Sequence, residues 1–277
     1  MTNIEYSKSI QTNSETSSTS GEASLFSRTL IIFDFDDTLF CTKYFDTFSL
    51  PYKDIFSSKI SLKEVNPDLV PEIKKLENTI IDLFFNLKQN YDIIIISNAD
   101  LKWINNCLNH FLKGLKEFIN ENDIKIYSAK NIFNKIVRNK TERKIKCFKK
   151  AINDLYKNDL NYTDLNVISI GDGNEEKKAA FSLAKCEKYH KINVKFIRMI
   201  TYPSAASIIL QLEYLNNNLN SMIFDNNTIF KMTIKIKNNK AEINCIVSKK
   251  NKSEDIYDNC LNLNYLDEKN SLFNYDK

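Results

Sequence analysis

The stretch LIIFDFDDTLF, Leu30 to Phe40, joins a short apolar run to a cluster of acids. The apolar run is too short for a helix, and it ends in three carboxylates within four residues, Asp34, Asp36 and Asp37. This pattern is typical of a buried β-strand that delivers acidic side chains to the edge of a sheet. Because like charges this close together repel one another, the stretch predicts a site for a metal ion or a phosphoryl group.

Length and composition favour a globular protein with one main core. The 277 residues are 43% hydrophobic and 27% charged, enough to bury one substantial core and a small appendage. The 39 basic and 35 acidic residues are interleaved and the net charge is only +4, so we expect no nucleic acid and no membrane as a partner. No apolar run approaches the length of about 18 residues that a membrane span needs.

The cysteines and the N-terminus favour a cytoplasmic location. The six cysteines are scattered without a CxxC pair, which predicts reduced thiols rather than a disulfide framework. The first residues lack the basic segment and apolar core of a secretion signal. We therefore expect a cytoplasmic protein.

Strand-like and helix-like segments alternate through most of the chain. Apolar, β-branched runs predict strands, and apolar residues at helical spacing between them predict helices. The expected strands are 29–34, 92–97, 124–128, 166–171 and 194–197. The expected helices begin at Asn66-Pro67, cover 101–119, begin again near 141, pass through 179–183, and close the series at 204–215. Such alternation predicts an α/β fold, a doubly wound, Rossmann-like parallel sheet with helices on both faces.

Three regions lie outside this alternation. Residues 1–24 are rich in Ser, Thr, Glu and Asn and predict a disordered leader, which precedes a core domain at 25–220. Residues 41–65 predict a loop or short flap over the acids. The two-residue alternation on either side of Asn238-Asn239 predicts a β-hairpin, an added edge or lid, in a C-terminal extension and tail at 221–277.

The residues that follow each expected strand are the candidates for a functional site, because the carboxyl ends of parallel strands share one edge of the sheet. The first strand delivers Asp34 and Asp36 to this edge. The second delivers Ser97 and Asn98, a hydroxyl and an amide that can donate hydrogen bonds to an anion.

The fourth strand ends in Asp172 between Gly171 and Gly173, two of only four glycines in the chain. Glycines in these positions indicate a backbone that turns tightly or approaches a ligand closely. The helix that begins near residue 141 carries two lysines close to its start, Lys144 and Lys146.

The order of these groups resembles the motif order of the haloacid dehalogenase (HAD) superfamily. DFDDTL at 34–39 resembles the first motif, DxDx[TV][LV]; ISN at 96–98 resembles the second; Lys146 stands for the third; and GDGNEE at 171–176 resembles the fourth. The motifs span residues 29 to about 180, and the general architecture extends to about 217. The leader and the hairpin lie outside the resemblance.

The resemblance implies phosphoryl transfer through a covalent intermediate. Asp34 would attack phosphorus and form an aspartyl phosphate. Asp36 would protonate the leaving oxygen and then deprotonate the water that hydrolyses the intermediate. By the same resemblance, the phosphoryl group would be bound by Ser97, Asn98 and Thr38.

The same resemblance implies Mg²⁺ as the cofactor. The ion would be held by Asp34, the backbone carbonyl of Asp36, and Asp172. Glu176 stands four residues beyond Asp172, one helical turn away, and could hold a water on the metal. The lysine beside the phosphoryl group is Lys146, which follows an apolar residue and precedes Phe148; Lys144 is the alternative.

The presence of Asp36 favours a phosphatase acting on a phosphorylated substrate. Neither the gap from Asp34 to Ser97 nor the gap from Ser97 to Lys146 holds a full cap domain, which implies an open site suited to phosphoproteins or other bulky phosphoesters. A phosphotransferase or phosphomutase with the same intermediate is one alternative. A non-catalytic scaffold that binds a phosphorylated partner is the other.

Other residues have simpler interpretations. Asp37 is interpreted as a solvated neighbour of the site. Trp103 is expected to pack in the core or against the start of a helix. The basic segment 135–157 is interpreted as a solvated helix face rather than as a rim that attracts anions.

Overall fold

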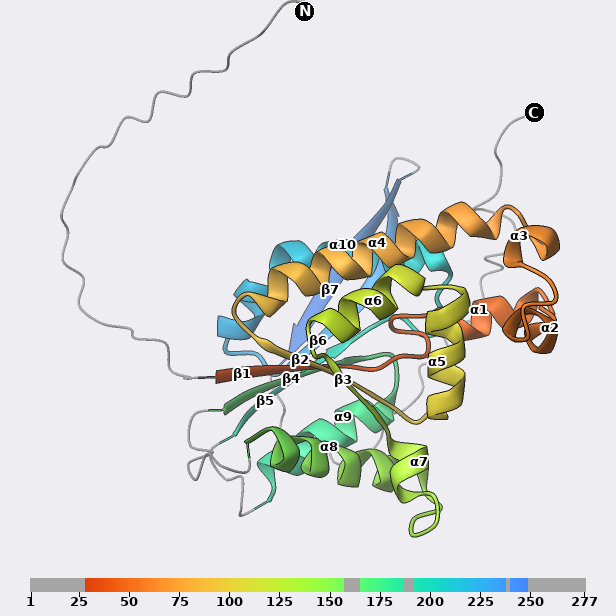
Figure 1. Ribbon diagram of the computed structural model, residues 1–277. Coiled ribbons are helices and arrows are strands. Elements are labelled where there is room, and N and C mark those ends of the chain that lie inside the picture. The colour runs from red at the N-terminus through yellow and green to blue at the C-terminus, as the bar shows by residue number, and fades with distance from the viewer. Residues whose placement is uncertain (1–27, 157–164, 187–191, 238–239, 249–277) are drawn as a thin grey trace, which may run out of the picture.

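The chain forms an α/β fold around a seven-stranded, mostly parallel sheet. The computed structural model describes residues 28–156, 165–186, 192–237 and 240–248. The strands lie in the order β3-β2-β1-β4-β5-β6-β7 (Figure 1). Neighbouring strands from β3 to β6 pair in parallel, and β7 pairs with β6 in the antiparallel direction. The strands are β1 (Arg28–Phe33), β2 (Asp92–Ser97), β3 (Lys125–Ser128), β4 (Leu165–Gly171), β5 (Asn193–Arg198), β6 (Ile229–Lys237) and β7 (Lys240–Ser248).

Helices cover both faces of the sheet. Figure 1 shows α4 (Leu69–Lys88), α6 (Lys113–Glu121) and α10 (Ala205–Phe224) above the strands, and α8 (Lys140–Tyr156) and α9 (Asn174–Ala184) below them. The shorter helices are α1 (Thr42–Thr47), α2 (Tyr52–Phe56), α3 (Leu62–Val65), α5 (Leu101–His110) and α7 (Ala129–Phe133). None of the helices in the described ranges has the length and apolar character needed to cross a membrane.

The central strand β1 is buried on both of its faces, as its unbroken apolar sequence predicts. Successive side chains of a strand point to opposite sides, so Ile31 and Phe33 enter one hydrophobic core while Leu30 and Ile32 enter the other. Each of these four side chains is at most 1% exposed. The strand therefore holds the two helical layers together and fixes where its carboxyl end lies.

The flap predicted at residues 41–65 contains three short helices, α1, α2 and α3, at the end of the sheet where the strands end (Figure 1). The Ser61 hydroxyl accepts the N–H of Glu64 and the Glu64 carboxylate accepts the N–H of Ser61, a capping box that starts α3. The expected helix start at Asn66-Pro67 was wrong, because Asn66 caps the end of α3, Pro67 and Asp68 form a turn, and α4 begins at Leu69.

The single helix expected over 101–119 is instead two helices. α5 ends at His110, and α6 begins at Lys113. The buried Glu77 of α4 accepts the N–H groups of Gly114 (2.5 Å) and Leu115 (3.1 Å), which are free at the start of a new helix. A buried carboxylate of α4 thus satisfies N–H groups in the first turn of α6 and stabilises the start of this second helix.

The C-terminal part of the described chain continues the same sheet. The closing helix, α10, extends to Phe224 rather than to 215. β6 pairs with β5 through Ile197 and Phe230, so the alternating segment is an added edge. Residues 238–239, the leader at 1–24 and the tail after residue 248 lie outside the described residues.

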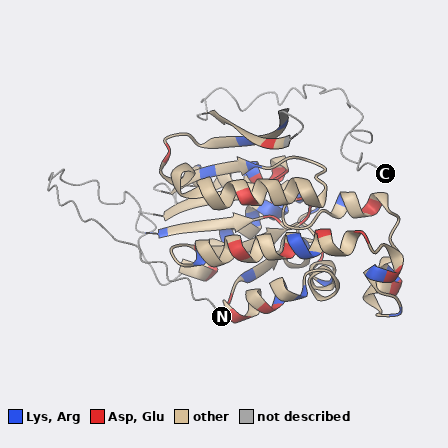
Figure 2. Ribbon diagram, turned by 90° about the horizontal axis from the view of Figure 1, so that it is seen from above, with Lys and Arg blue, Asp and Glu red and all other residues tan. Residues whose placement is uncertain are grey.

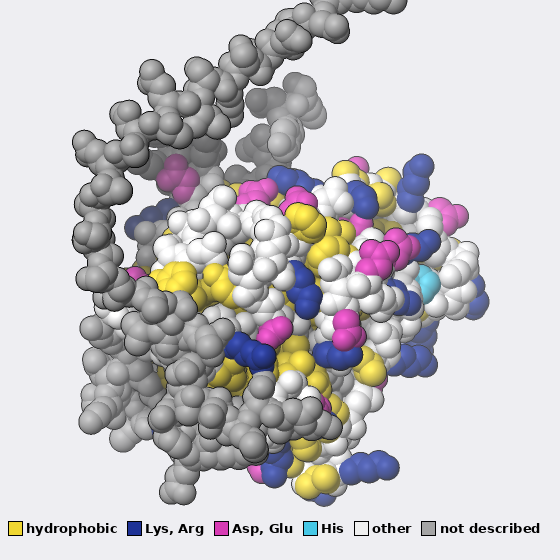
Figure 3. Space-filling view, turned by 60° about the vertical axis from the view of Figure 1, so that its left-hand side comes forward, with side chains coloured by type: hydrophobic (Ala, Val, Ile, Leu, Met, Phe, Trp, Pro, Cys, Tyr) yellow, Lys and Arg dark blue, Asp and Glu magenta, His cyan; other side chains and the backbone are white. Residues whose placement is uncertain are grey.

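Charged side chains of both signs are interleaved over the fold. Lys and Arg alternate with Asp and Glu along the helices (Figure 2). The face shown in Figure 3 also carries both signs side by side, with apolar side chains between them. The arrangement matches the interleaving of charges in the sequence.

Candidate active site

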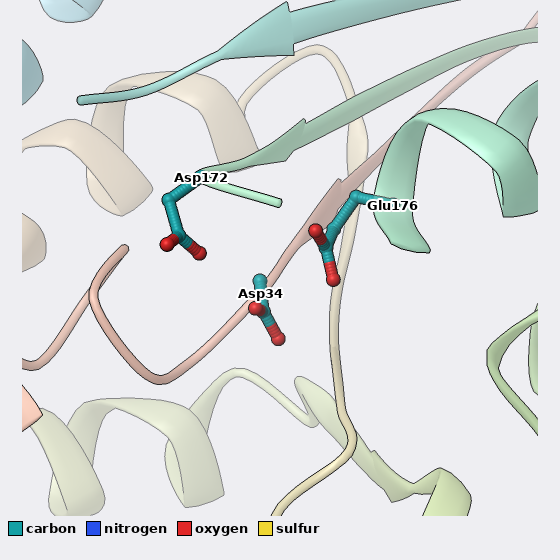
Figure 4. A group of neighbouring side chains, drawn as sticks. All are labelled: Asp34, Asp172 and Glu176. Atoms are coloured by element: carbon teal, nitrogen blue, oxygen red, sulfur yellow. The ribbon is translucent and has the colours of Figure 1, made fainter. Parts of the chain in front are cut away.

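Three acidic side chains meet at the carboxyl edge of the sheet. Asp34 follows β1, Asp172 follows β4, and Glu176 lies in the first turn of α9 (Figure 4). One carboxylate oxygen from each lies within 4.8 Å of the other two. The backbone holds Asp34 beside β4, because the N–H of Asp34 donates to the carbonyl of Ile170 at 2.9 Å. This hydrogen bond fixes the end of β1 against β4.

Two glycines make room for Glu176 in this cluster. A Cβ atom at Gly171 would lie 2.5 Å from the Glu176 Cγ, and one at Gly173 would lie 2.5 Å from its Oε2. Contacts this short exclude any side chain at either position unless Glu176 moves. The glycines predicted from sequence to allow a close approach therefore allow the approach of a carboxylate of this chain.

The lysine of the site is Lys144, and the assignment of Lys146 to this role was wrong. The Lys144 Nζ lies 2.7 Å from Asp34 Oδ1 and also contacts Glu176 Oε1. Its side chain is 1% exposed. The side chain of Lys146 is 43% exposed and lies 3.9 Å from Glu142, one helical turn away on the same surface.

The phase of α8 explains the correction. Lys144 is three and four residues before Cys147 and Phe148, which are both buried, so all three lie on the same face of the helix. Ile145, the residue after Lys144, is half-buried and packs against the core. The spacing to Cys147 and Phe148 is the sequence signal that identifies Lys144.

Burial and mutual repulsion shape the charges of the cluster. Burial raises the pKa of Asp34 well above its usual range, although Lys144 opposes this shift. Burial and the nearby charge of Glu176 raise the pKa of Asp172 to about 7. Burial also acts on Glu176, but its contacts with Lys144 and with backbone N–H groups lower its pKa overall. Lys144 therefore contacts two of the three acids, Asp34 and Glu176.

Asp36 lies next to the cluster and is held by three hydrogen-bond donors. Its Oδ1 accepts from the Thr42 hydroxyl at 2.6 Å and from the Trp103 indole N–H at 3.0 Å. Its Oδ2 accepts a longer bond from the Ser97 hydroxyl, at 3.4 Å. Trp103 thus has a polar contact with a predicted catalytic acid, in addition to the packing expected of it, and sequence reasoning missed both this contact and Thr42.

Asp37 is buried rather than solvated, so its interpretation as an exposed neighbour was wrong. Its side chain is 3% exposed, and Lys43 reaches it twice, with its Nζ at 2.9 Å and its backbone N–H at 3.0 Å. The Lys43 Nζ also lies 3.8 Å from Asp172 and 4.0 Å from the centre of the Tyr202 ring. Asp37 therefore ties α1 to the edge of the sheet.

The predicted phosphate-binding residues lie at the same edge. Ser97 is 1% exposed, and its hydroxyl accepts the backbone N–H of Ala99 at 2.9 Å. The buried hydroxyl of Thr38 and the side-chain oxygen of Asn98 have no hydrogen-bond partner among the described residues. Buried polar atoms of this kind are normally paired, and of these two only the Thr38 hydroxyl can donate to a phosphoryl oxygen.

The donor set fits a hard divalent cation such as Mg²⁺. Asp34, Asp172 and Glu176 offer carboxylate oxygens, which are the ligands that Mg²⁺ and Ca²⁺ take in proteins. Burial is the main cause of the raised pKa values of Asp34 and Asp172, and the charge of Glu176 adds to both shifts.

No protein family and no curated protein matches this chain.

Proposed function

We propose that this protein is a Mg²⁺-dependent phosphatase of the HAD type, which hydrolyses a phosphomonoester through an aspartyl phosphate on Asp34. In this proposal the sheet is a doubly wound, Rossmann-like one, and β6 and β7 form its hairpin extension. The observation that carries the proposal is the meeting of Asp34 with Asp172, Glu176 and Lys144 at one edge of the sheet. These groups come from three separate parts of the chain, in the order that the HAD motifs have.

The first step is attack by Asp34 on phosphorus. A carboxylate oxygen of Asp34 forms a bond to phosphorus as the bond from phosphorus to the leaving oxygen breaks. Lys144 stabilises the ionised form of Asp34 before the attack and the phosphoryl charge after it. Asp34, Asp172 and Glu176 would hold Mg²⁺, which would supply further positive charge for the phosphoryl oxygens.

Asp36 moves the protons in both steps. It donates a proton to the leaving oxygen in the first step, and the resulting carboxylate takes a proton from water in the second. That water attacks the aspartyl phosphate, releases inorganic phosphate and restores Asp34. Ser97 and Thr38 are the hydroxyl donors for the phosphoryl oxygens.

The substrate of this proposal is a phosphorylated protein or another bulky phosphoester, in the cytoplasm. The segment after Asp34 is filled by the short helices α1, α2 and α3 and by α4, which leaves no separate cap domain there. Between Ser97 and Lys144 lie α5, α6, β3 and α7; β3 is a strand of the sheet and α6 covers one of its faces, so this segment holds no separate cap domain either (Figure 1). Such a site does not have to close around a small substrate.

The test is hydrolysis of p-nitrophenyl phosphate with and without Mg²⁺. We expect Asp34→Asn to lower kcat by at least about a thousandfold, because it removes the nucleophile. Removal of Mg²⁺ with a chelator should abolish activity, and added Mg²⁺ should restore it. The matched control is Asp82→Asn, an exposed aspartate of α4, which should keep full activity.

Activity that survives Asp34→Asn, or that chelation leaves unchanged, would overturn the mechanism. Acid quenching of the wild-type enzyme during turnover should trap phosphate on Asp34, and peptide mapping by mass spectrometry locates it.

A further inference from the structure

The carboxylate of Asp36 is held asymmetrically. Oδ1 accepts two short hydrogen bonds, from Thr42 at 2.6 Å and from Trp103 at 3.0 Å. Oδ2 has one contact, with Ser97 at 3.4 Å, which is long for a bond between two oxygens. Two donors occupy the two lone pairs of Oδ1, so Oδ2 is the oxygen left to exchange a proton with a substrate.

The two donors to Oδ1 come from different elements. Thr42 is the first residue of α1, in the segment that follows the acidic stretch, and Trp103 lies in the first turn of α5, after β2. The carboxylate is therefore fixed from two sides by elements that do not belong to β1. A single bond would let the carboxyl group rotate about its χ2 angle, whereas two bonds from different directions restrict it.

An aromatic wall holds the Trp103 indole in place. Its ring meets Tyr52 edge to face, with ring centres 5.1 Å apart, and Phe56 in the same way at 5.6 Å. Both partners belong to α2, and Phe111 packs against each of them at 6.5 and 5.9 Å. Packing of this kind fixes the direction of the indole N–H, since a planar ring has few ways to fit.

We propose that Trp103 and Thr42 are positioning residues for proton transfer by Asp36, which they orient so that Oδ2 faces the leaving oxygen. The inference rests on the proposed phosphatase function and adds a role for the helices α1 and α2, which support the acid. In the first step the proton moves from Oδ2 to the leaving oxygen as the bond to phosphorus breaks, and Oδ1 keeps both of its hydrogen bonds throughout.

The leaving group separates this role from a general effect on the active site. Departure of p-nitrophenolate needs no proton, whereas departure of an alkoxide does. The ratio kcat/KM reports the steps up to release of the leaving group, so hydrolysis of the aspartyl phosphate does not affect it. We therefore compare kcat/KM for p-nitrophenyl phosphate and for β-glycerophosphate, an alkyl phosphate.

We expect Trp103→Phe, which keeps an aromatic ring and removes the N–H, to lower kcat/KM for β-glycerophosphate about tenfold or more. The value for p-nitrophenyl phosphate should change by less than about threefold. Thr42→Val should likewise lower kcat/KM for β-glycerophosphate and leave the value for p-nitrophenyl phosphate nearly unchanged. Thr42→Ser, which keeps the hydroxyl, should retain the wild-type value for both substrates. Phe85→Leu, at an exposed phenylalanine of α4 that lies outside the aromatic wall, is the control and should leave kcat/KM for both substrates unchanged.

The hydrogen bond has a spectroscopic readout that does not depend on activity. Trp103 is the only tryptophan in the chain, so its indole N–H gives a single resonance in a ¹⁵N correlation spectrum. Asp36→Asn should shift this resonance and increase the rate at which the N–H exchanges with water. An unchanged resonance would overturn the contact on which the inference depends.

The kinetic outcomes distinguish this inference from the proposed function. One outcome is that Asp34→Asn abolishes activity while Trp103→Phe and Thr42→Val lower kcat/KM for both substrates by the same factor. In that case the proposed phosphatase function stands and the positioning role is overturned. If the wild-type protein hydrolyses neither substrate, or if Asp34→Asn keeps its activity, both are overturned.

Discussion

Two carboxylates buried to the same degree behave differently in this molecule. Glu77 of α4 and Glu176 of α9 are each 4% exposed. Glu77 accepts the N–H groups of Gly114 and Leu115 at the start of α6, and an exposed lysine, Lys74, lies 2.5 Å away. Its charge is matched by backbone donors and by the positive end of a helix.

Glu176 faces other acids instead. Its carboxylate lies beside Asp34 and Asp172, and the Lys144 ammonium is the cation buried with them. Backbone donors satisfy Glu77, whereas Glu176 shares its site with two other carboxylates, which repel it, and with the Lys144 ammonium. The comparison contrasts a carboxylate that accepts backbone N–H groups of another helix with one that faces two other acids at the edge of the sheet.

The strongest way to break the comparison is to remove Lys144. We expect Lys144→Met to lower the free energy of unfolding by about 3–5 kcal/mol, because it leaves Asp34 and Glu176 buried without their cation. Lys146→Met, two residues along the same helix, should change it by less than about 0.5 kcal/mol. Urea unfolding at pH 7 measures both, and equal effects would mean that Lys144 is not the lysine of the site.

Removing the structural carboxylate should have a smaller effect, and only on stability. We expect Glu77→Ala to lower the free energy of unfolding by about 1–3 kcal/mol, because the N–H groups of Gly114 and Leu115 lose their acceptor. Its kcat for p-nitrophenyl phosphate, measured well below the melting temperature, should equal that of the wild type. Lys74→Ala, which removes only the exposed partner, should cost less than about 1 kcal/mol.

A tenfold loss of kcat in a folded Glu77→Ala protein would contradict the division between the two carboxylates. It would mean that the junction of α4 and α6 controls the geometry of the site.

Removing a carboxylate of the site should raise the free energy of unfolding, whereas removing Glu77 should lower it. The pKa of Asp172 is about 7 in the folded protein, against an ordinary value of 3.8, so the folded state binds more protons than the unfolded state between these values. Stability without metal therefore falls as pH rises from about 4 to 7. Asp172→Asn removes this loss, and in a chelator we expect it to be more stable than the wild type at pH 8, by on the order of 1 kcal/mol.

The gain from Asp172→Asn should be smaller at pH 5 than at pH 8, and thermal unfolding at both values measures it. Mg²⁺ should raise the melting temperature of the wild type at pH 8 and leave that of Asp172→Asn unchanged, because binding to the folded state stabilises it. A variant less stable than the wild type at both pH values would show that Asp172 is a structural residue like Glu77.

Periodicity and strand-end chemistry predicted most of the fold and the acids of the site. Apolar runs predicted the five parallel strands from β1 to β5. The residues that end these runs predicted that Asp34 and Asp172 lie at one edge of the sheet. These features are local, since a strand and the acid that follows it are adjacent in the sequence. The antiparallel pairing of β7 with β6 also follows from alternation, which is local in the same way.

Two of the errors concern contacts between segments that are distant in the sequence. The division between α5 and α6 depends on Glu77, and the role of Trp103 depends on Asp36; neither partner is near in the chain. Lys146 was chosen over Lys144 from its immediate neighbours, although the spacing to Cys147 and Phe148 identifies the buried face. The phase of α8 was therefore a signal in the sequence that could have identified Lys144. No sequence signal predicted the hydrogen bonds made by Glu77 and Trp103.

The pairing of β1 with β4 has a consequence for how the chain folds. Leu30 pairs with Val167, about half the chain later, although β2 and β3 are made in between. Loops this long close slowly, and parallel pairing between distant segments delays folding. During synthesis, β1 and its acids leave the ribosome long before β4 is available to cover them. β1, apolar on both faces, is thus a segment that needs protection from aggregation until its partner strand is made.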